Sequence, residues 1–320
     1  MLSPDVAAEI TTKICLGVKA YERFLIVTDT ETSEIGNYLL DAGLRIGAEA
    51  MLVVMKPRTR HGEEPPEPVA EALTLVDVFV APTKFSLSHT QARKRATEKG
   101  VRGATMPGIT MDMFLTTLSA DYEKIRSFNH QLKKMLEGKK TVRITTSLGT
   151  DLTLSIEGRT VISDDGLIHE KGSFGNLPAG EVFVAPVEGS ANGLLVIDAS
   201  VAGIGVLEHP IEVVVENGFA ARIKGEMQAE KLRNMLSSVG IREAFNIAEL
   251  GFGTNPNASV IGNVLEDEKA FGTVHIAFGD NSTIGGLTKA GIHVDAILTE
   301  PTVSVDGEFI LKNGTWTWTL

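Results

Sequence analysis

The chain has 320 residues, of which 43% are hydrophobic and 22% are charged, so it can fill the core of one large domain or two ordinary ones. Its formal net charge of -11 argues against a broad surface for nucleic-acid phosphates, and no apolar run approaches the roughly 20 residues of a membrane-spanning helix. The beginning of the chain lacks the pattern of a secretory signal, and Cys15 as the single cysteine excludes an internal disulfide. We therefore expect a cytoplasmic, soluble protein that binds neither nucleic acid nor membranes.

The first 130 residues alternate apolar strand patterns with helical patterns. Residues 24–29 and 48–56 are compact apolar runs, and a helical pattern lies between them. A third run at 77–82 precedes a helical segment that ends at Gly100. Buried strands separated by helices are typical of a doubly wound, mostly parallel sheet. Because no phosphate-binding glycine motif follows any of these strands, dinucleotide or P-loop binding has no support in the sequence.

The periodicity changes after a long amphipathic helix predicted over 122–140. Residues 141–159 alternate apolar and polar side chains around a Leu-Gly-Thr-Asp turn, which indicates an antiparallel hairpin. Further strand patterns follow, with one clear helical pattern that ends at Gly240. We predict two domains: an α/β domain over 1–130, and a β-rich α+β domain that binds metal over 131–320.

A short motif near the end of the chain is the best candidate for chemistry. His293 and Asp295 stand two positions apart in a strand pattern, so both side chains can project from one face of a sheet. His275 precedes them, and the Gly-rich loop between can fold it back to the same point. Two imidazoles and one carboxylate suit Zn, Mn, Co or non-haem Fe(II).

Two glutamates extend this set. Glu181 and Glu249 each stand beside an apolar strand or turn with Gly-rich neighbours, where a carboxylate is costly to bury without a cation or a hydrogen-bond donor. With both included, the residues suffice for two metal ions that share a carboxylate; without them, the triad would hold one ion. The ordinary interpretation is hydrogen-bonded core histidines and surface glutamates at strand ends.

His89 and Arg93 form the polar pair of interest in the first half. They lie four residues apart and so share one face of a predicted helix. The pair can hold a substrate carboxylate beside the metal centre, or it can be an ordinary surface histidine on a helix capped by Ser88. We count both residues as candidate substrate-binding residues.

Four segments of the second half resemble the aminopeptidase T and aminopeptidase S family of metallopeptidases. They contain Glu181, Glu249, His275, and His293 with Asp295, and they read NLPAGEVFVAPVEGSANG, AELGFGTNPNA, HIAFGD and HVDAIL. The first-half segment SLSHTQARKRATEKGVRGATMPGIT is similar to the corresponding part of the same group, so the resemblance spans most of the chain. The chain is similar also to the 2,5-dihydroxypyridine 5,6-dioxygenases, the ring-cleaving enzymes that share this fold.

The peptidase resemblance implies a homodimer in which all five residues bind a pair of divalent ions, Zn, Co or Mn. Glu249 would also be the bridging ligand and general base that activates water. The peptidases carry a Tyr shortly after the first ligand histidine, and Ser282 stands in its approximate place here. Loss of such a donor to the developing oxyanion typically costs about 100-fold or more in rate.

The dioxygenase resemblance implies a different division of roles. Fe(II) would be held by His275, His293 and Asp295, with Glu181 and Glu249 as groups that orient ligands or substrate. Because the two glutamates are retained, we expect first a metal-dependent aminopeptidase-like hydrolase that removes N-terminal residues from short peptides. The alternative is an Fe(II)-dependent ring-cleaving dioxygenase of the 2,5-dihydroxypyridine type, and a third hypothesis is a non-catalytic protein that binds a metal or a small molecule.

Overall fold

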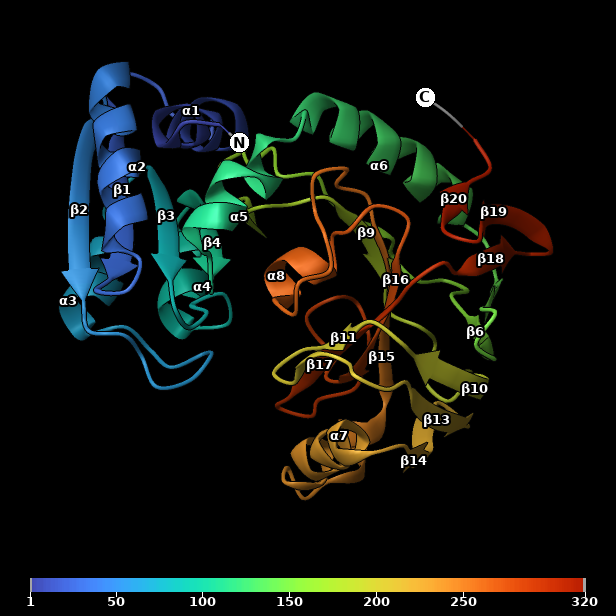
Figure 1. Ribbon diagram of the computed structural model, residues 1–320. Helices are drawn as coiled ribbons and strands as arrows, with labels where there is room; N and C mark the ends of the chain where they lie inside the picture. Colours follow the sequence, from blue (N-terminus) through green and yellow to red (C-terminus); the bar gives the residue numbers. More distant parts are fainter. Residues whose placement is uncertain (1, 319–320) are drawn as a thin grey trace. The chain divides into compact units, whose positions relative to one another are not determined.

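The computed structural model describes residues 2–318, which divide into two compact units (Figure 1). The first unit runs to Arg126 and also includes Asp164–Ala179, and the second comprises Ser127–Ser163 and the chain from Gly180 onward. The sequence predicts a division near residue 130 but contains no sign that Asp164–Ala179 returns to the first unit. Each unit has its own sheet system, so they are described separately.

A five-stranded parallel sheet forms the centre of the first unit, within the part of the chain that the structure describes. In spatial order its strands are β2 (Glu49–Met55), β1 (Arg23–Asp29), β3 (Val78–Thr83), β4 (Arg102–Pro107) and β8 (Phe174–Asn176). Strands β1 and β3 are almost wholly buried, as their continuous apolar runs require. The predicted α/β domain with a mostly parallel sheet is confirmed.

Helix α2 (Ser33–Ile46) shows how the apolar pattern sets the packing of this unit. Ile35, Leu39 and Ala42 recur at helical spacing and are buried. The helix ends at Gly47, which adopts the left-handed conformation with φ 86° that favours glycine at this position. The other helical segments of the unit are α1 (Pro4–Glu9), the π-helical η1 (Ile10–Cys15), α3 (Glu67–Ala72), α4 (Gln91–Glu98), α5 (Met111–Leu115) and the 3-10 turn η2 (Thr117–Ser119).

Helix α6 (Tyr122–Leu136) carries the chain onward, at the position where the sequence predicts a long amphipathic helix. Its residues Phe128, Leu132 and Leu136 belong to the core of the second unit. In the part of the chain that the structure describes, no helix combines the length and the apolar character that crossing a bilayer demands.

Two sheets of antiparallel strand pairs build the second unit and share one hydrophobic core. Among residues 2–318, the eight-stranded sheet has the order β14 (Phe219–Lys224), β13 (Ile211–Glu216), β10 (Asn192–Ile197), β6 (Asp151–Ser155), β5 (Thr141–Thr145), β18 (Thr302–Val305), β19 (Glu308–Lys312) and β20 (Thr315–Trp316). The seven-stranded sheet has the order β12 (Gly205–Val206), β11 (Ser200–Val201), β17 (His293–Leu298), β16 (Val274–Gly279), β15 (Ile247–Gly253), β9 (Glu181–Val184) and β7 (Ile162–Asp164). The helical segments are α7 (Met227–Ser237), α8 (Val264–Asp267) and the 3-10 turn η3 (Arg242–Phe245). The predicted β-rich α+β character and the hairpin β5–β6 are confirmed.

Candidate metal centre

The five residues singled out as metal ligands lie on four neighbouring strands of the seven-stranded sheet. Glu181 begins β9, Glu249 lies in β15, His275 in β16, and His293 and Asp295 in β17. These strands are adjacent in the order β17-β16-β15-β9. The sheet therefore brings together side chains that are more than a hundred positions apart in the sequence.

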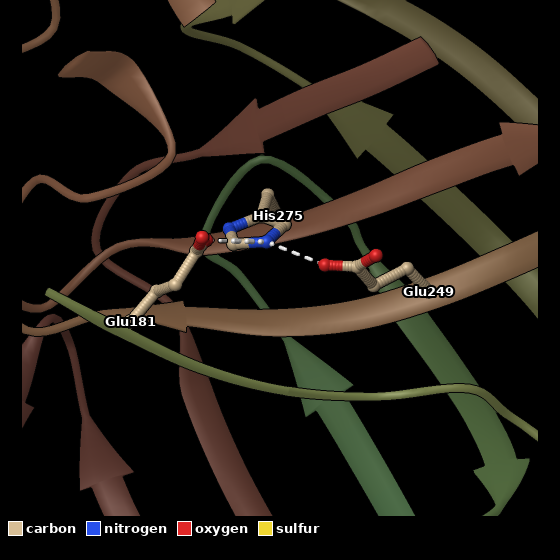
Figure 2. Close-up of side chains that lie close together, drawn as sticks. All are labelled: Glu181, Glu249 and His275. Atoms are coloured by element: carbon tan, nitrogen blue, oxygen red, sulfur yellow. Dashed lines mark hydrogen bonds and ion pairs between the residues drawn. The ribbon is translucent and has the colours of Figure 1, made fainter. Parts of the chain in front are cut away.

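The imidazole of His275 lies between Glu181 and Glu249 (Figure 2). Its Nε2 is 3.2 Å from Oε1 of Glu249 and 3.5 Å from Oε2 of Glu181. The other oxygen of Glu249, Oε2, lies 3.4 Å from Nε2 of His293, which in turn is 3.4 Å from Oδ1 of Asp295. Glu249 thus connects the two imidazoles, and the five side chains form one continuous polar cluster inside the unit.

A glycine opposite His275 makes room for its ring. The pairing of β15 with β16 places Gly251 across from His275, and a Cβ built on Gly251 would lie 1.9 Å from His275 Nε2. Any other residue at this position would occupy the space of the imidazole. Real Cβ contacts are essentially never closer than 3.0 Å, so Gly251 is a structural requirement of the cluster.

The pKa values of the two imidazoles in the cluster are raised above their ordinary value. Burial by itself lowers the pKa of His275, but the hydrogen bond to Glu249 and the charges of Glu181, Glu249 and Asp295 outweigh it and raise that pKa to about 9. For His293, burial is likewise outweighed, chiefly by Asp295, and the pKa is raised well above its ordinary value. The negative charges of the carboxylates therefore favour positive charge in the cluster, which either protons or a metal ion can supply.

The pKa values of the carboxylates Asp295 and Glu249 shift in the opposite direction, below their ordinary values. Burial raises the pKa of Asp295, but the charge and hydrogen bond of His293 outweigh it and lower the pKa to about 2. The pKa of Glu249 is also lowered, because hydrogen bonds from His275 and His293 exceed the effect of burial. Both groups stay ionised at neutral pH, as metal ligands must.

Two overlapping sets of donor atoms have the spacing of a metal site. The donor atoms of Glu249, His293 and Asp295 lie within 4.8 Å of one another, and so do those of Glu181, Glu249 and His275. Imidazole nitrogen and carboxylate oxygen suit Fe(II), Mn or Zn, so the residues present fit the predicted divalent ion. Among the described residues, His293 and Asp295 group with Glu249 and not with His275, which differs from the triad that the dioxygenase resemblance implies.

The two sets of donor atoms differ in how far their histidine is exposed to solvent. The side chain of His293 is 32% exposed, whereas that of His275 is 0% exposed. His275 Nδ1 is buried without a hydrogen-bond partner among residues 2–318. In the set of Glu249, His293 and Asp295, His293 is therefore partly open to solvent, whereas His275 lies in the interior.

The loop between β16 and β17 orients His293. Its Nδ1 lies 2.7 Å from the carbonyl oxygen of Asp280, which only accepts hydrogen bonds, so Nδ1 donates and Nε2 is directed toward the cluster. The carboxylate of Asp280 accepts hydrogen bonds from the backbone of Ser282 and Ala290, which fixes the loop. Ser282, in the approximate place of the peptidase Tyr, donates its own hydroxyl to Asp280 at 2.7 Å and is part of this turn.

A buried lysine beside the cluster was not expected. Lys269 is 0% exposed, and its ammonium group lies 3.3 Å from Oε1 of Glu181 and also pairs with Glu268. In the sequence it follows a run of acidic residues at 266–268, a pattern more typical of a solvated turn. Nothing in that local pattern distinguishes it from a surface lysine.

Arg93 lies in α4 of the first unit, but His89 precedes the helix cap Thr90, so the two residues do not share a helix face as the sequence predicts. His89 is exposed, and Thr90 caps the helix by accepting from the backbone N–H of Arg93, in the role that the ordinary interpretation gives to Ser88. The guanidinium of Arg93 donates to the carbonyl of Ser88 at 2.6 Å and lies 4.3 Å from the ring centroid of Phe174. A role of this pair in substrate binding stays a prediction.

Comparison with known proteins identifies the family. A family model described as NicX, 2,5-dihydroxypyridine 5,6-dioxygenase, matches residues 11–317. A curated 2,5-dihydroxypyridine 5,6-dioxygenase from Pseudomonas putida is 25% identical in an alignment of length 192 that covers 56% of this chain and 55% of that protein. The match therefore spans about half the length of this curated relative.

Solved structures show the same fold. The structure of 2,5-dihydroxypyridine dioxygenase from Pseudomonas putida KT2440 covers 100% of this chain and 99% of its own, with a TM-score of 0.82 and 18% identity. Wild-type AmpT from Thermus thermophilus covers 98% of this chain and 99% of its own, with a TM-score of 0.73 and 18% identity. The fold is thus shared with both groups that the sequence resembles.

The expectation of a metallo-aminopeptidase is wrong. The family model and the curated relative both point to dioxygenases, so the terms hydrolase, aminopeptidase and metalloprotease do not apply. The retained pair of glutamates was the reason for that expectation, but Glu181 is already paired with the cation of Lys269. The chain belongs to the 2,5-dihydroxypyridine 5,6-dioxygenase family.

Proposed function

We propose that this protein is an Fe(II)-dependent dioxygenase that cleaves a dihydroxylated, nitrogen-containing aromatic ring of the 2,5-dihydroxypyridine type. The observation that carries the proposal is the family match over residues 11–317, which includes every residue of the metal centre. The geometry of the second unit supports it, because three side chains with the spacing of a metal site lie within one sheet, and one of them, His293, is partly exposed. The substrate is expected to be a small molecule.

The residues that would hold the iron are Glu249, His293 and Asp295. Imidazole nitrogen and carboxylate oxygen are donor types that a non-haem Fe(II) ion would accept. When bound, Fe(II) supplies a site at which a dihydroxylated ring and oxygen exchange electrons. His293 must lose its proton before it can act as a ligand, and the low pKa of Asp295 keeps its carboxylate ready to bind.

The interior side chains orient the ligands and hold a proton. His275 Nε2 donates to Oε1 of Glu249, which leaves Oε2 of the same carboxylate facing His293. Because the carboxylate oxygen only accepts, Nε2 of His275 carries the proton of this hydrogen bond. His275 therefore fixes the rotation of Glu249, in the way that outer hydrogen-bond partners orient ligands in other metal sites.

Oxygen consumption tests this proposal. Protein purified without oxygen and loaded with Fe(II) should consume one O2 for each 2,5-dihydroxypyridine, with loss of the absorbance of the ring. His293→Gln should abolish both signals, whereas His209→Gln, a change to an exposed histidine paired with Glu226, should leave them intact. Stoichiometric iron without oxygen uptake on dihydroxypyridines would contradict the proposal.

A further inference from the structure

Strand β2 is an edge strand of the sheet in the first unit (Figure 1). Its parallel pairing with β1 extends from Glu49 to Met55 without a bulge. Among residues 2–318, no strand pairs with the opposite edge of β2. Backbone N–H and C=O groups that face this edge are therefore available to a strand from another chain.

The side chains of this edge strand are apolar but incompletely covered. Every residue from Ala50 to Met55 is apolar. Met51 is 44% exposed and Val54 is 49% exposed, and the two residues between them are half-buried. Proteins usually protect an edge strand with a charged residue, a proline or a bulge, and the stretch 50–55 contains none of these. One copy of the chain thus leaves part of this apolar strand in contact with water.

Helix α2 adds a further apolar side chain beside the strand. A Cβ built on Gly43 would lie 2.9 Å from the Cβ of Ala50, so the end of α2 packs directly on β2. The next residue, Leu44, is 54% exposed. Single exposed apolar residues are common on protein surfaces. Here, however, Leu44, Met51 and Val54 lie on two elements that pack against each other.

The charges at the two ends of the strand favour a second copy of the chain as its partner. Glu49 begins β2 and Lys56 directly follows it, and both residues are exposed. Antiparallel pairing of two β2 strands brings the acidic start of one copy next to the basic end of the other. A two-fold axis repeats this contact at both ends of the paired strands. Parallel pairing would bring like charges together, which is unfavourable.

The alternation of backbone groups along a strand restricts the register. Residues directly opposite each other in an antiparallel pair direct their backbone groups to the same side, either both toward the partner or both away. Two copies of β2 therefore overlap over their full length when Leu52 faces Leu52 of the second copy. Met51 then faces Val53, and Glu49 faces Met55, next to Lys56 of the second copy. Within residues 50–54, every opposed pair is apolar.

We propose that β2 binds β2 of a second copy of this chain, in antiparallel pairing about a two-fold axis at Leu52. The five-stranded sheets of the two copies then join into one continuous sheet. The proposal concerns the first unit and depends neither on the metal centre nor on the ring-cleaving reaction.

Sedimentation equilibrium of the full chain tests this interface. The wild type should contain an even number of chains, and Met51→Lys/Val54→Lys should halve that number, because lysines on an edge strand prevent strand pairing. Both side chains are exposed, so the variant should keep the wild-type circular dichroism spectrum. The matched control is Val206→Lys/Met227→Lys, which changes a valine 51% exposed and a methionine 71% exposed in the second unit and should leave the assembly intact.

A charge exchange tests the antiparallel arrangement. Lys56→Glu places two carboxylates together at each end of the paired strands, and we expect the dissociation constant to rise roughly 3- to 10-fold. Glu49→Lys/Lys56→Glu exchanges the two charges and should restore the affinity of the wild type. Restoration is specific to pairing between two copies, because a different protein on this edge would meet both charges reversed.

Three results would overturn the proposal: a monomeric wild type, an unchanged assembly in folded Met51→Lys/Val54→Lys, or a charge exchange that restores nothing. If the lysine variant does not fold, hydrogen exchange of the wild type decides in its place. Dissociation on dilution should then accelerate amide exchange within residues 49–56, and unchanged exchange there would exclude this interface. A monomer that still consumes oxygen on dihydroxypyridines contradicts the interface and leaves the proposed function standing.

Discussion

Glu249 contacts both imidazoles of the centre, one with each carboxylate oxygen. Oε1 accepts from His275, and Oε2 faces His293 at 3.4 Å. Burial raises the pKa of Glu249, but the hydrogen bonds from the two histidines lower it, so the carboxylate stays charged. The two histidines are therefore not equivalent: in the proposed function His293 would be a ligand at the more exposed side, and His275 would orient Glu249 from the interior.

Because of this difference, we expect glutamine substitutions at His293 and at His275 to affect metal binding differently. His293→Gln removes a ligand and should abolish tight binding of Fe(II) or Mn(II). His275→Gln keeps a hydrogen-bond donor near Glu249 and should still bind one ion, with an affinity weakened roughly 10- to 100-fold, as for other residues that orient ligands. Metal titration by calorimetry compares the two variants. Loss of the ion in His275→Gln together with its retention in His293→Gln would show that the assignment is reversed.

At the scale of elements, the pairing of strands decides which predicted residues meet. The spacing of His293 and Asp295 predicts a shared face, and both lie on β17. The partner of this pair depends on strand order and register, which local sequence patterns do not contain. A possible signal for the position of His275 was Gly251, because a glycine within an apolar strand often marks a close approach.

The loop between β16 and β17 acts as a unit that positions His293. Asp280→Ala removes the carboxylate that accepts from Ser282 and Ala290, so the carbonyl that receives His293 Nδ1 loses its fixed place. We expect metal affinity to fall roughly 10- to 100-fold, while one ion still binds at saturation.

Asp306→Ala provides the matched comparison. Asp306 also accepts hydrogen bonds from backbone N–H groups, those of Lys140 and Thr141. Within residues 2–318, no hydrogen bond or ion pair joins Asp306 to His293. Its loss should leave the affinity for Mn(II) unchanged when both variants are titrated in parallel. Equal affinities of the Asp280 and Asp306 variants would argue against an orienting role of the loop.

For the whole molecule, periodicity predicts the fold class but not the path of the chain. Continuous apolar runs indicate the parallel sheet of the first unit, and alternating patterns indicate the antiparallel sheets of the second. The return of Asp164–Ala179 to the first unit escaped prediction because β8 has only three residues and joins the sheet through tertiary pairing with β4. Lys269 was missed for a related reason, since its burial depends on the close approach of its segment to β15 and on its pairing with Glu181, which local sequence patterns do not contain.

The concentration of charge in the centre predicts how the stability of the metal-free protein depends on pH. The folded pKa of His275, about 9, lies above its ordinary 6.5, so its contribution is complete below pH 6.5 and is lost as pH rises through 9. The folded pKa of Asp295, about 2, lies below 3.8, so its contribution is present above pH 3.8 and is lost as pH falls through 2.

The urea midpoint of the metal-free protein should therefore decrease between pH 6.5 and pH 9. Saturation with Mn(II) should reduce or reverse the decrease, because a bound ion replaces the protons of the imidazoles and binds more tightly as pH rises. His275→Gln should flatten the curve of the metal-free protein. A midpoint that increases over the same range in the metal-free wild type would contradict the protonation states assigned to the centre.

The position and number of bound ions test the central claim most directly. A crystal of the Fe(II)-loaded protein, measured at the iron absorption edge, should show one anomalous peak per chain, coordinated by Glu249, His293 and Asp295. A peak among Glu181, Glu249 and His275, or two peaks per chain, would contradict this account.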